Sequence, residues 1–350
     1  MSDTRAVLCG YYGKGNGGDE ALLVSLLQML PEGVKPIVLS GNPAQTTDLY
    51  GVESCDRASA FPILKALKKS DFFIWGGGSL MQDATSIASP IYYAGLMALA
   101  QQKGLKTIAW AQGIGPLNSW FTRWLTRQVL LGCTAISVRD NASAELLRSW
   151  QIEPLVAPDP VWALQSITVK GLANFPQPRV AVTLRSHPRL TAQRLETLTT
   201  ALVDFQTATG CFILLVPFQP AQDLEIAKYL ATQLGEQCTI IPLQDPRELK
   251  GLFKEVKMTI GMRLHSLIMA AAEQSLCFAI SYDPKVTQLM SELNIPGWKL
   301  SQLPQNATEI SQTWQEYYNT GEKLNITTIQ SLVHNASLHQ ELLFQTIINC

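Results

Sequence analysis

The stretch Gly261-Met-Arg-Leu-His-Ser-Leu-Ile-Met-Ala270 is the clearest architectural signal in the chain, because it joins a strand pattern to a helix pattern across one glycine. The apolar run before it, Met258-Thr259-Ile260, predicts a buried strand, and Gly261 permits a sharp turn. From Leu264 onward, apolar residues recur at i, i+3, i+4 and i+7, the spacing of a helix packed on a sheet. Strand, tight turn and helix in this order form the repeating unit of a parallel α/β sheet.

The same stretch also carries chemistry, since Arg263 and His265 flank Leu264 at the predicted start of the helix. Free backbone N–H groups and the helix dipole favour an anion at such a position. Arg263 would add a fixed positive charge, and His265 would add an imidazole that can exchange a proton. An arginine held in a salt bridge and a histidine that caps a turn are the alternative interpretation, and this stretch alone leaves both open.

Composition limits the possible classes of protein. A chain of 350 residues with 47% apolar residues is long enough for two globular domains. The formal net charge of -1 argues against a nucleic-acid-binding protein, which would carry a basic surplus. The sequence contains no continuous run of basic residues that would indicate binding to an anionic membrane surface.

Cysteine usage and the first residues of the chain predict a cytoplasmic protein. The 7 cysteines are scattered without paired spacing, which is typical of reduced, mostly buried thiols. The first apolar run, Ala6 to Cys9, is too short for a signal peptide or a membrane span.

Three glycine-containing loops follow three predicted strands in the first half of the chain. The strand–loop pairs are Ala6–Cys9 with Gly10–Glu20, Asp71–Trp75 with Gly76–Asp83, and Lys106–Trp110 with Ala111–Leu117. In a parallel sheet these loops share the edge at which ligands bind. The segment Gly13-Lys-Gly-Asn-Gly-Gly18 matches a dinucleotide-binding fingerprint only weakly, because the turn is long and the second strand ends in Ser40 instead of an acidic residue. An ordinary glycine-rich loop is the alternative.

Alternation of strands and helices continues through most of the chain and predicts the fold class. We predict an α/β protein with two doubly wound Rossmann-like domains, whose parallel sheets face a cleft as in the glycosyltransferase-B plan. The predicted boundaries are residues 1–165 for the N-terminal domain, 175–305 for the C-terminal domain and 306–350 for C-terminal helices that pack back on the domains. A Pro- and Gly-containing segment ending at Pro178 predicts the linker.

Seven stretches together resemble one family, the polysaccharide pyruvyl transferases that modify cell-wall polymers and exopolysaccharides. They are Gly10-Tyr-Tyr-Gly13 with Asn16-Gly-Gly-Asp-Glu20, Gly76-Gly-Gly-Ser-Leu-Met-Gln-Asp83, Gln112-Gly-Ile-Gly-Pro116, Ser137-Val-Arg-Asp140, Pro158-Asp-Pro160, Met262-Arg-Leu-His-Ser-Leu-Ile268 and Ser281-Tyr-Asp-Pro-Lys285. The resemblance extends nearly from the start of the chain to about Val286. Members of this family often carry an arginine followed by proline and an aromatic residue after the strand at Val180. Here the segment is Arg185-Ser-His-Pro188, so Arg185 fits the pattern and the resemblance gives His187 no role.

The resemblance implies a reaction and its partners. The donor would be phosphoenolpyruvate, and the acceptor would be a sugar with two nearby hydroxyls, either in a polymer or on a lipid-linked precursor. The product would be a cyclic pyruvate ketal, with release of phosphate. The resemblance implies no metal and no cofactor apart from the co-substrate. A lipid-linked acceptor would bring the protein to the inner face of the membrane, and the oligomeric state stays open.

The second half of the chain supplies the predicted donor site. Arg263 and Arg185, at adjacent strand ends, would clamp the phosphate and carboxylate of the donor, because planar guanidinium groups suit both anions. The N–H groups around Leu264 and Ser266 would complete the seat, and Lys285 could assist the departure of phosphate. His265 is the best candidate for the acid that protonates the enol carbon.

The glycine loops of the first half supply the predicted acceptor side. Asp19 and Asp83 are candidates for the catalytic base, although Asp19 is equally suited to cap a helix. The other acceptor or loop residues are Tyr12, Gly13, Asn16, Glu20, Gly77, Gly78, Ser79, Gln112 and Gly113. Tyr11, Tyr12 and the region of Trp75 could stack on a sugar ring, although buried aromatic residues are the commoner case for Trp75.

Two other functions stay open on the sequence. A glycosyltransferase of the same architecture would use a nucleotide-sugar donor and would need a diphosphate seat in the second domain. A non-catalytic module that binds sugar or phosphate could share the fold, because fold alone does not name a reaction.

Overall fold

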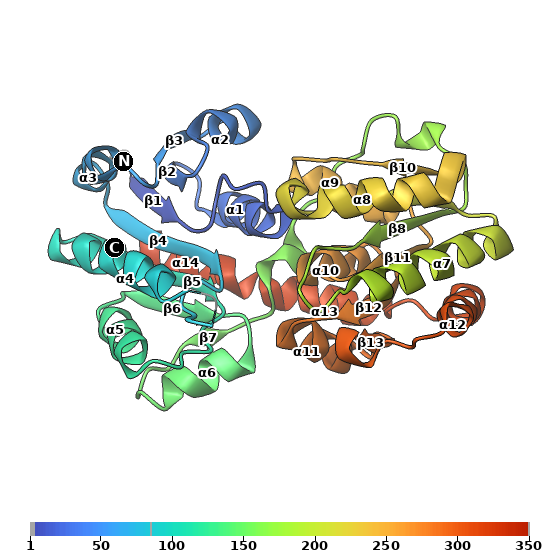
Figure 1. The fold of residues 1–350 in the computed structure, drawn as a ribbon. Helices are drawn as coiled ribbons and strands as arrows, with labels where there is room; N and C mark the ends of the chain where they lie inside the picture. The colour runs from blue at the N-terminus through green and yellow to red at the C-terminus, as the bar shows by residue number, and fades with distance from the viewer. Residues whose placement is uncertain (1–3, 85, 349–350) are drawn as a thin grey trace. The chain divides into compact units, whose positions relative to one another are not determined.

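The computed structural model describes residues 4–84 and 86–348, and these residues form two compact units (Figure 1). Unit 1 comprises residues 4–14, 19–164 apart from residue 85, and 331–348. Unit 2 comprises Gly15–Gly18 and Gln165–Gln330. Neither unit is therefore a single continuous segment of the chain.

Unit 1 is built on a sheet of seven parallel strands in the order β3-β2-β1-β4-β5-β6-β7. The strands are β1 (Arg5–Cys9), β2 (Lys35–Ser40), β3 (Glu53–Asp56), β4 (Phe72–Gly78), β5 (Lys106–Gln112), β6 (Ala135–Val138) and β7 (Leu155–Val156). The strand order reverses between β1 and β4, which pair directly. This is the Rossmann arrangement, in which the loops after the two central strands border the ligand site.

Helices cover both faces of the unit 1 sheet. They are α1 (Gly17–Met29), α2 (Pro43–Tyr50), α3 (Ala60–Lys68), α4 (Ala88–Gln102), α5 (Trp120–Leu131), α6 (Asn141–Arg148) and α14 (Leu338–Ile348). One core cluster joins α3, α4, α5 and α6 to the sheet through residues such as Trp75 and Met97. A second cluster joins α1 and α14 to the sheet through Trp110 and Leu343. Each strand of the centre is buried on both faces, which is why its sequence is continuously apolar.

Unit 2 repeats the plan with six parallel strands in the order β10-β9-β8-β11-β12-β13. The strands are β8 (Arg179–Thr183), β9 (Phe212–Leu215), β10 (Cys238–Ile240), β11 (Met258–Gly261), β12 (Leu276–Ser281) and β13 (Gly297–Lys299). Here the order reverses between β8 and β11. The stretch that begins at Met258 forms one of the two central strands, as its apolar pattern predicts.

The unit 2 helices also lie on both faces of their sheet. They are α7 (Ala192–Thr209), α8 (Pro220–Leu234), α9 (Pro246–Lys254), α10 (Leu264–Ala272), α11 (Pro284–Leu293), α12 (Ala307–Thr320) and the first part of α13 (Ile326–Ala336). The main core joins α7, α8 and α12 to the sheet, with Phe205 and Trp314 among its largest side chains. Helix α10 packs against β11, β12 and α9.

The predicted fold class is confirmed by the two parallel sheets with helices on both faces. The two compact units divide the chain differently from the predicted boundaries, for example at Gln165, which lies in unit 2. Gly15–Gly18 belongs to unit 2, although it lies within the predicted N-terminal domain, and residues 331–348 belong to unit 1. No helix among residues 4–84 and 86–348 is long and apolar enough to cross a bilayer.

Candidate functional site

The reversal point of the unit 2 sheet brings the predicted donor residues to one edge. Strands β8 and β11 pair in parallel, with Thr183 opposite Gly261. Arg185 and Arg263 each follow the end of one of these strands by two residues. The prediction that both arginines follow adjacent strand ends is thus confirmed. In sheets of this kind, ligands bind outside the carboxyl ends of the two central strands.

Helix α10 begins at this edge with Leu264, directly after Arg263. Arg263 occupies the N-cap position with extended backbone (φ −87°, ψ 131°), and its side chain makes no capping hydrogen bond. The hydroxyl of Ser266 donates to the Arg263 carbonyl (2.7 Å) and pairs with the Thr183 hydroxyl (2.8 Å). The Ser266 side chain therefore ties the helix start to β8. The backbone N–H groups of the first turn are the part of this helix suited to an anion.

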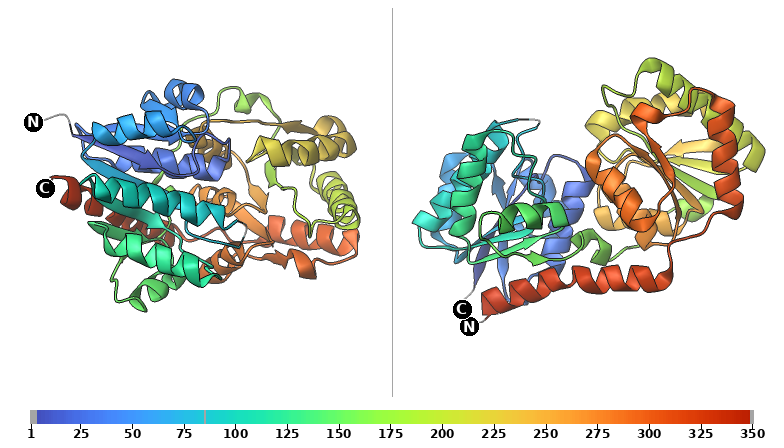
Figure 2. Two further views of the ribbon diagram at one scale, coloured as in Figure 1. Left: turned by 60° about the vertical axis from the view of Figure 1, so that its left-hand side comes forward. Right: turned by 90° about the horizontal axis from the view of Figure 1, so that it is seen from below.

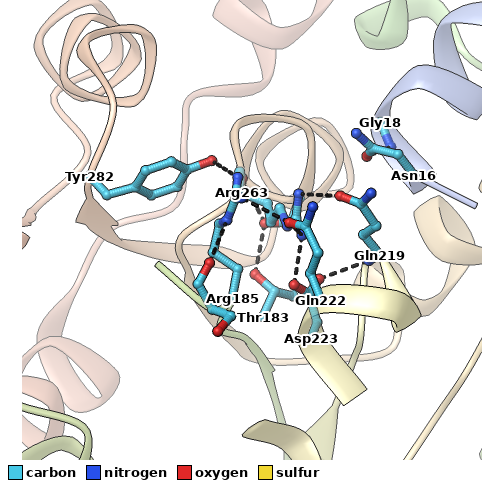
Figure 3. Close-up of polar contacts among 11 residues, drawn as sticks. Asn16, Gly18, Thr183, Arg185, Gln219, Gln222, Asp223, Arg263 and Tyr282 are labelled. Atoms are coloured by element: carbon cyan, nitrogen blue, oxygen red, sulfur yellow. Dashed lines mark hydrogen bonds and ion pairs between the residues drawn. The ribbon is translucent and has the colours of Figure 1, made fainter. Parts of the chain in front are cut away.

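Arg263 is not the freely presented donor clamp that the sequence predicts. Its side chain is 8% exposed and pairs with the Asp223 carboxylate at 2.6 Å. It also donates to Gln219 Oε1 (3.2 Å) and Gln222 Oε1 (3.4 Å), as Figure 3 shows. The salt-bridge interpretation that the sequence left open is the one observed. A charge that is already neutralised by a buried carboxylate has little attraction left for a second anion.

Arg185 is the arginine at this edge whose charge is still available. Its guanidinium donates to Tyr282 Oη (2.7 Å) and Gln222 Oε1 (2.8 Å), and it lies 4.8 Å from the centre of the Tyr282 ring. Within the described part of the chain, Arg185 forms no ion pair with a carboxylate. Gln222 accepts hydrogen bonds from both Arg185 and Arg263 (Figure 3). The buried Arg263–Asp223 ion pair therefore helps to hold Gln222, and Gln222 in turn orients Arg185.

His187 lies beside the same network, with its ring 4.8 Å from that of Tyr282. Burial, together with the positive charges of Arg185 and Arg189, lowers the pKa of His187. A histidine that is held neutral near pH 7 is poorly suited to donate a proton.

His265, the predicted acid, lies half-buried in the first turn of α10 and packs against Gly18 of the first glycine loop. A methyl group built on Gly18 would lie 2.3 Å from His265 Nδ1. Gly17, which belongs to unit 2 like Gly18, donates its N–H to the Phe218 carbonyl (2.8 Å). The structure therefore brings the predicted glycine loop and His265 together, and only glycine leaves room for the imidazole.

The start of helix α1 differs from the prediction. The Asn16 side chain accepts a hydrogen bond from Gly18 N–H (3.1 Å), and α1 begins at Gly17. Asn16 therefore caps the helix, a role predicted for Asp19. Asp19 lies within the first turn, where a negative charge is favoured by the helix dipole. A methyl group built on Gly78 would lie 3.6 Å from Asp19 Oδ1, so this carboxylate borders the second glycine loop.

Lys285 lies at the next strand end, after β12. Asp283 caps helix α11 by accepting a hydrogen bond from Lys285 N–H (2.8 Å), as the Asp-Pro sequence predicts. The Lys285 side chain is half-buried. Its predicted contact with phosphate stays a prediction.

Asp83 has a structural role in unit 1 in place of the predicted catalytic one. Its carboxylate accepts hydrogen bonds from the backbone N–H groups of Asn118 (2.7 Å) and Ser119 (2.8 Å) and from the Thr122 hydroxyl (2.6 Å). Burial alone would raise the pKa of Asp83, but these hydrogen bonds outweigh it and lower the pKa. A carboxylate that is occupied and weakly basic at the start of α5 is not a suitable general base.

Tyr12 and Trp75 are core residues and do not form a sugar-stacking surface. Tyr12 is 1% exposed and its hydroxyl donates to the Gly76 carbonyl, while Trp75 is fully buried. Burial, with nearby Cys9 and Asp19, raises the pKa of Tyr12 well above its usual value. Tyr11 is the exposed aromatic residue of this loop.

Glu20 is a buried carboxyl group that holds the first glycine loop in place. It accepts hydrogen bonds from Gly13 N–H (2.8 Å) and from the Tyr50 hydroxyl (3.2 Å). Burial, the largest effect, raises the pKa of Glu20 to about 7, and the charge of Asp19 adds to the shift. With this raised pKa, the Glu20 carboxyl group would exchange a proton near neutral pH.

Replacing Glu20 by Gln should change how stability depends on pH. The pKa of Glu20 is about 7 in the folded protein, and its ordinary value is 4.5, so the folded state holds the Glu20 proton more tightly than the unfolded state does. The free energy of unfolding therefore falls as the pH rises from 4.5 to about 7. We therefore expect Glu20→Gln to gain stability relative to the wild type across this window, by up to about 3 kcal/mol above it. Urea unfolding at about pH 5 and about pH 8 measures the difference. The exposed Glu32→Gln is the matched control, and equal pH dependence of Glu20→Gln and wild type would contradict the assignment.

A second polar cluster lies at the same edge of the unit 1 sheet. Arg139 pairs with Asp159 at 2.6 Å and donates to Ser79 Oγ at 3.1 Å. Gly113 packs so closely that a methyl group on it would lie 3.0 Å from Ser79 Oγ. Arg139 is thus the partner of a buried carboxylate. Gln112 is fully buried and donates to the Trp110 carbonyl (2.9 Å), so it belongs to this scaffold and not to an exposed surface.

Comparison with known proteins gives the family. The sequence model of the polysaccharide pyruvyl transferases matches residues 16–284. The chain belongs to this family. The match contains the second and third glycine loops of unit 1 together with Arg185, Arg263 and His265 of unit 2, and it begins within the first loop, at Asn16. A search of curated proteins found no sequence match.

Solved structures similar to this pyruvyl transferase family member share its fold. UDP-GlcNAc 2-epimerase from Neisseria meningitidis, bound to UDP-GlcNAc, has a TM-score of 0.66 at 9% identity and covers 99% of this chain and 100% of its own. The 2-epimerase from Methanocaldococcus jannaschii has a TM-score of 0.66 at 11% identity, with 97% and 99% covered. A glycosyltransferase from Rickettsia africae has a TM-score of 0.58 at 14% identity, with 100% of both chains covered. These likenesses establish a glycosyltransferase-B fold and leave the reaction to the site.

Sequence reasoning missed several polar residues of this family member. One missed group lies at the start of helix α8 and consists of Gln219, Gln222 and Asp223. In the sequence, the motif Pro217-Phe-Gln-Pro220 indicates only a turn at this place. Arg57 lies over the rings of Tyr11 (5.5 Å) and Tyr92 (5.1 Å), after a polar strand that has no clear pattern. An acidic residue in the first turn of a helix beside a predicted site was the one available signal for Asp223.

Proposed function

We propose that this protein transfers the pyruvyl group of phosphoenolpyruvate to a saccharide, forms a cyclic ketal and releases phosphate. The observation that supports it is the unit 2 sheet edge, where three groups come together. They are an arginine that pairs with no carboxylate of residues 4–84 and 86–348, the start of α10, whose N-cap side chain makes no capping hydrogen bond, and a histidine. These groups suit a small donor with two anionic groups. The family to which the chain belongs supplies the pyruvyl transfer.

The donor would bind through charge and directed hydrogen bonds. Arg185 offers a planar fork of N–H donors that matches a carboxylate or a phosphate. The first-turn N–H groups of α10, at Leu264 and Ser266, offer a second anion seat with the favourable end of the helix dipole. Lys285 would add a positive charge from the adjacent strand end.

The chemistry needs one proton at the enol carbon and removes one from each sugar hydroxyl. His265 would donate its proton to C3 of the donor, which leaves C2 electron-poor. One sugar hydroxyl oxygen forms a bond to C2, and the second displaces phosphate from C2 to close the ketal. Of the two hydroxyl protons, one restores the imidazolium of His265 and the other leaves with the phosphate. Asp19, at the rim of the second glycine loop, stays the predicted base for a hydroxyl.

Donor specificity can be tested directly. The protein is incubated with phosphoenolpyruvate or with a nucleotide sugar, with and without saccharide acceptors. We expect inorganic phosphate to be released from phosphoenolpyruvate only when a suitable saccharide is present, and mass analysis should show a pyruvate ketal on the saccharide. Release of a nucleoside diphosphate would instead identify a glycosyltransferase, the reaction named for the Rickettsia africae neighbour.

Replacing Arg185 by Ala should weaken donor binding. Hydrogen bonds to charged groups contribute about 1.5–3 kcal/mol, so we expect the Kd for phosphoenolpyruvate to rise about 10- to 150-fold. Isothermal titration with phosphoenolpyruvate measures the change. Arg189→Ala, an exposed arginine four residues away, is the matched control. Unchanged binding in Arg185→Ala would place the donor elsewhere.

A further inference from the structure

Several of the exposed apolar side chains of unit 1 lie on two neighbouring helices, α4 and α5, or at their first turns. Figure 2 shows these helices side by side along one face of the sheet, and they pack against each other. Both helices run from the carboxyl edge of the parallel sheet, so their first turns lie at the same end. The side chains that form this α4–α5 patch are Ile87, Ile91, Trp120, Phe121 and Trp124.

The aromatic residues of the α4–α5 patch form one contiguous group on α5, with Trp120 edge-on to Phe121 and Phe121 stacked on Trp124. Trp120 is 77% exposed and Trp124 is 51% exposed. Phe121 lies between them, 6.0 Å from Trp120 and 6.1 Å from Trp124 between ring centres. Two exposed tryptophans on one helix are unusual for a surface that meets only water, because indole groups bury large apolar areas.

The charged residues of α4 and α5 carry one sign. Arg123 and Arg127 lie on α5 among the aromatic residues, and α4 carries no charged residue. From Ala84 to Arg139 the sequence contains several basic residues and no Asp or Glu. Asp83, which precedes this segment, is occupied by hydrogen bonds from Asn118, Ser119 and Thr122. The basic residues are dispersed along the chain, which explains why no basic run is visible in the sequence.

We propose that the α4–α5 patch docks the protein on an anionic phospholipid surface. Tryptophan side chains prefer the interface between lipid and water, and a helix with aromatic residues and arginines on one face binds in that plane. The opposite face of α5 is anchored in the protein by Thr122, Thr126 and Val129, so the helix does not need to leave the fold. Arginines beside the aromatic residues would meet lipid phosphates.

A second copy of the chain fits this patch less well than a lipid surface does. A two-fold interface brings the same surface of two copies together. Arg123 and Arg127 of one copy would then lie near the same two arginines of the other copy. Helices α4 and α5 offer no carboxylate to neutralise these charges. Docking would also place the enzyme where a lipid-linked saccharide acceptor lies. This link between docking and the acceptor rests on the proposed function.

Vesicle flotation tests the docking without donor or acceptor. The full-length protein is mixed with vesicles of phosphatidylcholine alone or of phosphatidylcholine with phosphatidylglycerol. We expect flotation with the anionic vesicles and its loss at high salt. Trp120→Ser/Trp124→Ser should weaken partition at least on the order of tenfold, and Arg123→Gln/Arg127→Gln should weaken it about fivefold per arginine. Tyr229→Ser, an exposed aromatic residue on α8, is the matched control and should float like the wild type.

Three results would overturn the docking proposal. They are absence of wild-type flotation, equal loss in Tyr229→Ser, and a stable dimer in sedimentation that the double tryptophan variant dissociates. Circular dichroism of each variant checks that it is folded. Transfer to a water-soluble saccharide should be equal in wild type and Trp120→Ser/Trp124→Ser. Transfer without flotation would therefore overturn the docking alone, and flotation without transfer would overturn the proposed function alone.

Discussion

Replacing His265 by Ala is expected to abolish pyruvyl transfer while phosphoenolpyruvate still binds. The imidazole lies in the first turn of α10, against Gly18, at the edge that carries Arg185. Removing a general acid costs about 10²- to 10⁴-fold in rate. The donor charge would still be met by Arg185 and the helix start, so the Kd should change little. Phosphate release and isothermal titration, measured on the same preparation, separate the two effects.

His334→Ala is the control for this experiment, because His334 is exposed on α13. It should retain normal turnover. A His265→Ala protein with normal turnover would exclude His265 as the acid. If the wild type and His265→Ala both bind donor and acceptor but show no turnover, the protein would fit the non-catalytic module. Loss of donor binding in His265→Ala would instead make the imidazole a donor ligand.

Replacing Arg263 by Met is expected to destabilise the protein strongly. The change leaves the Asp223 carboxylate, which is 1% exposed, without its positive partner. Removing one member of a buried ion pair costs about 3–5 kcal/mol. Denaturant unfolding of the variant and the wild type measures the loss. Gln222 keeps its hydrogen bond from Arg185, so the loss of donor binding should be smaller than in Arg185→Ala.

The double variant Arg263→Met/Asp223→Asn shows whether the buried charge is the cause. Asparagine removes the charge and keeps an oxygen for the Gln219 N–H, which donates to Asp223 at 2.7 Å. We expect the double variant to regain a large part of the lost stability. Arg263→Met with wild-type stability would contradict the ion-pair role, and a Kd increase as large as that of Arg185→Ala would restore Arg263 as a direct donor ligand.

Local patterns predict the backbone of this protein well. The strand at Met258, the turn at Gly261 and the helix from Leu264 all follow from spacing, because each depends on residues within one or two turns. The polar strand β3 (Glu53–Asp56) was not predicted, since its sequence has no apolar alternation. It adds to the sheet through backbone pairing with β2, for which side chains give little signal.

The roles of charged side chains are harder to predict, because they depend on partners distant in sequence. Arg263 meets Asp223 across 40 positions, and Asp83 meets Ser119 across 36. Neither partner can be found from local spacing, so an arginine in a salt bridge and an aspartate that holds the start of α5 were predicted as a donor clamp and a base. Asn16 and Asp19 both have side chains suited to capping, and only the observed start of α1 at Gly17 separates them. Arg185, in contrast, was found correctly at its strand end.

The last helix of the chain has a consequence for protein synthesis. His339 of α14 is fully buried in unit 1, with Nδ1 at 2.9 Å from Ser137 Oγ and Nε2 at 3.0 Å from the Pro158 carbonyl. Leu343 fills the same side of the core. The ribosome makes these residues after every strand of the unit 1 sheet, so part of one apolar face of the nascent sheet stays uncovered until α14 has been synthesised. Truncation just before α14 should therefore yield a chain that chaperones retain, even though every strand of that sheet is present.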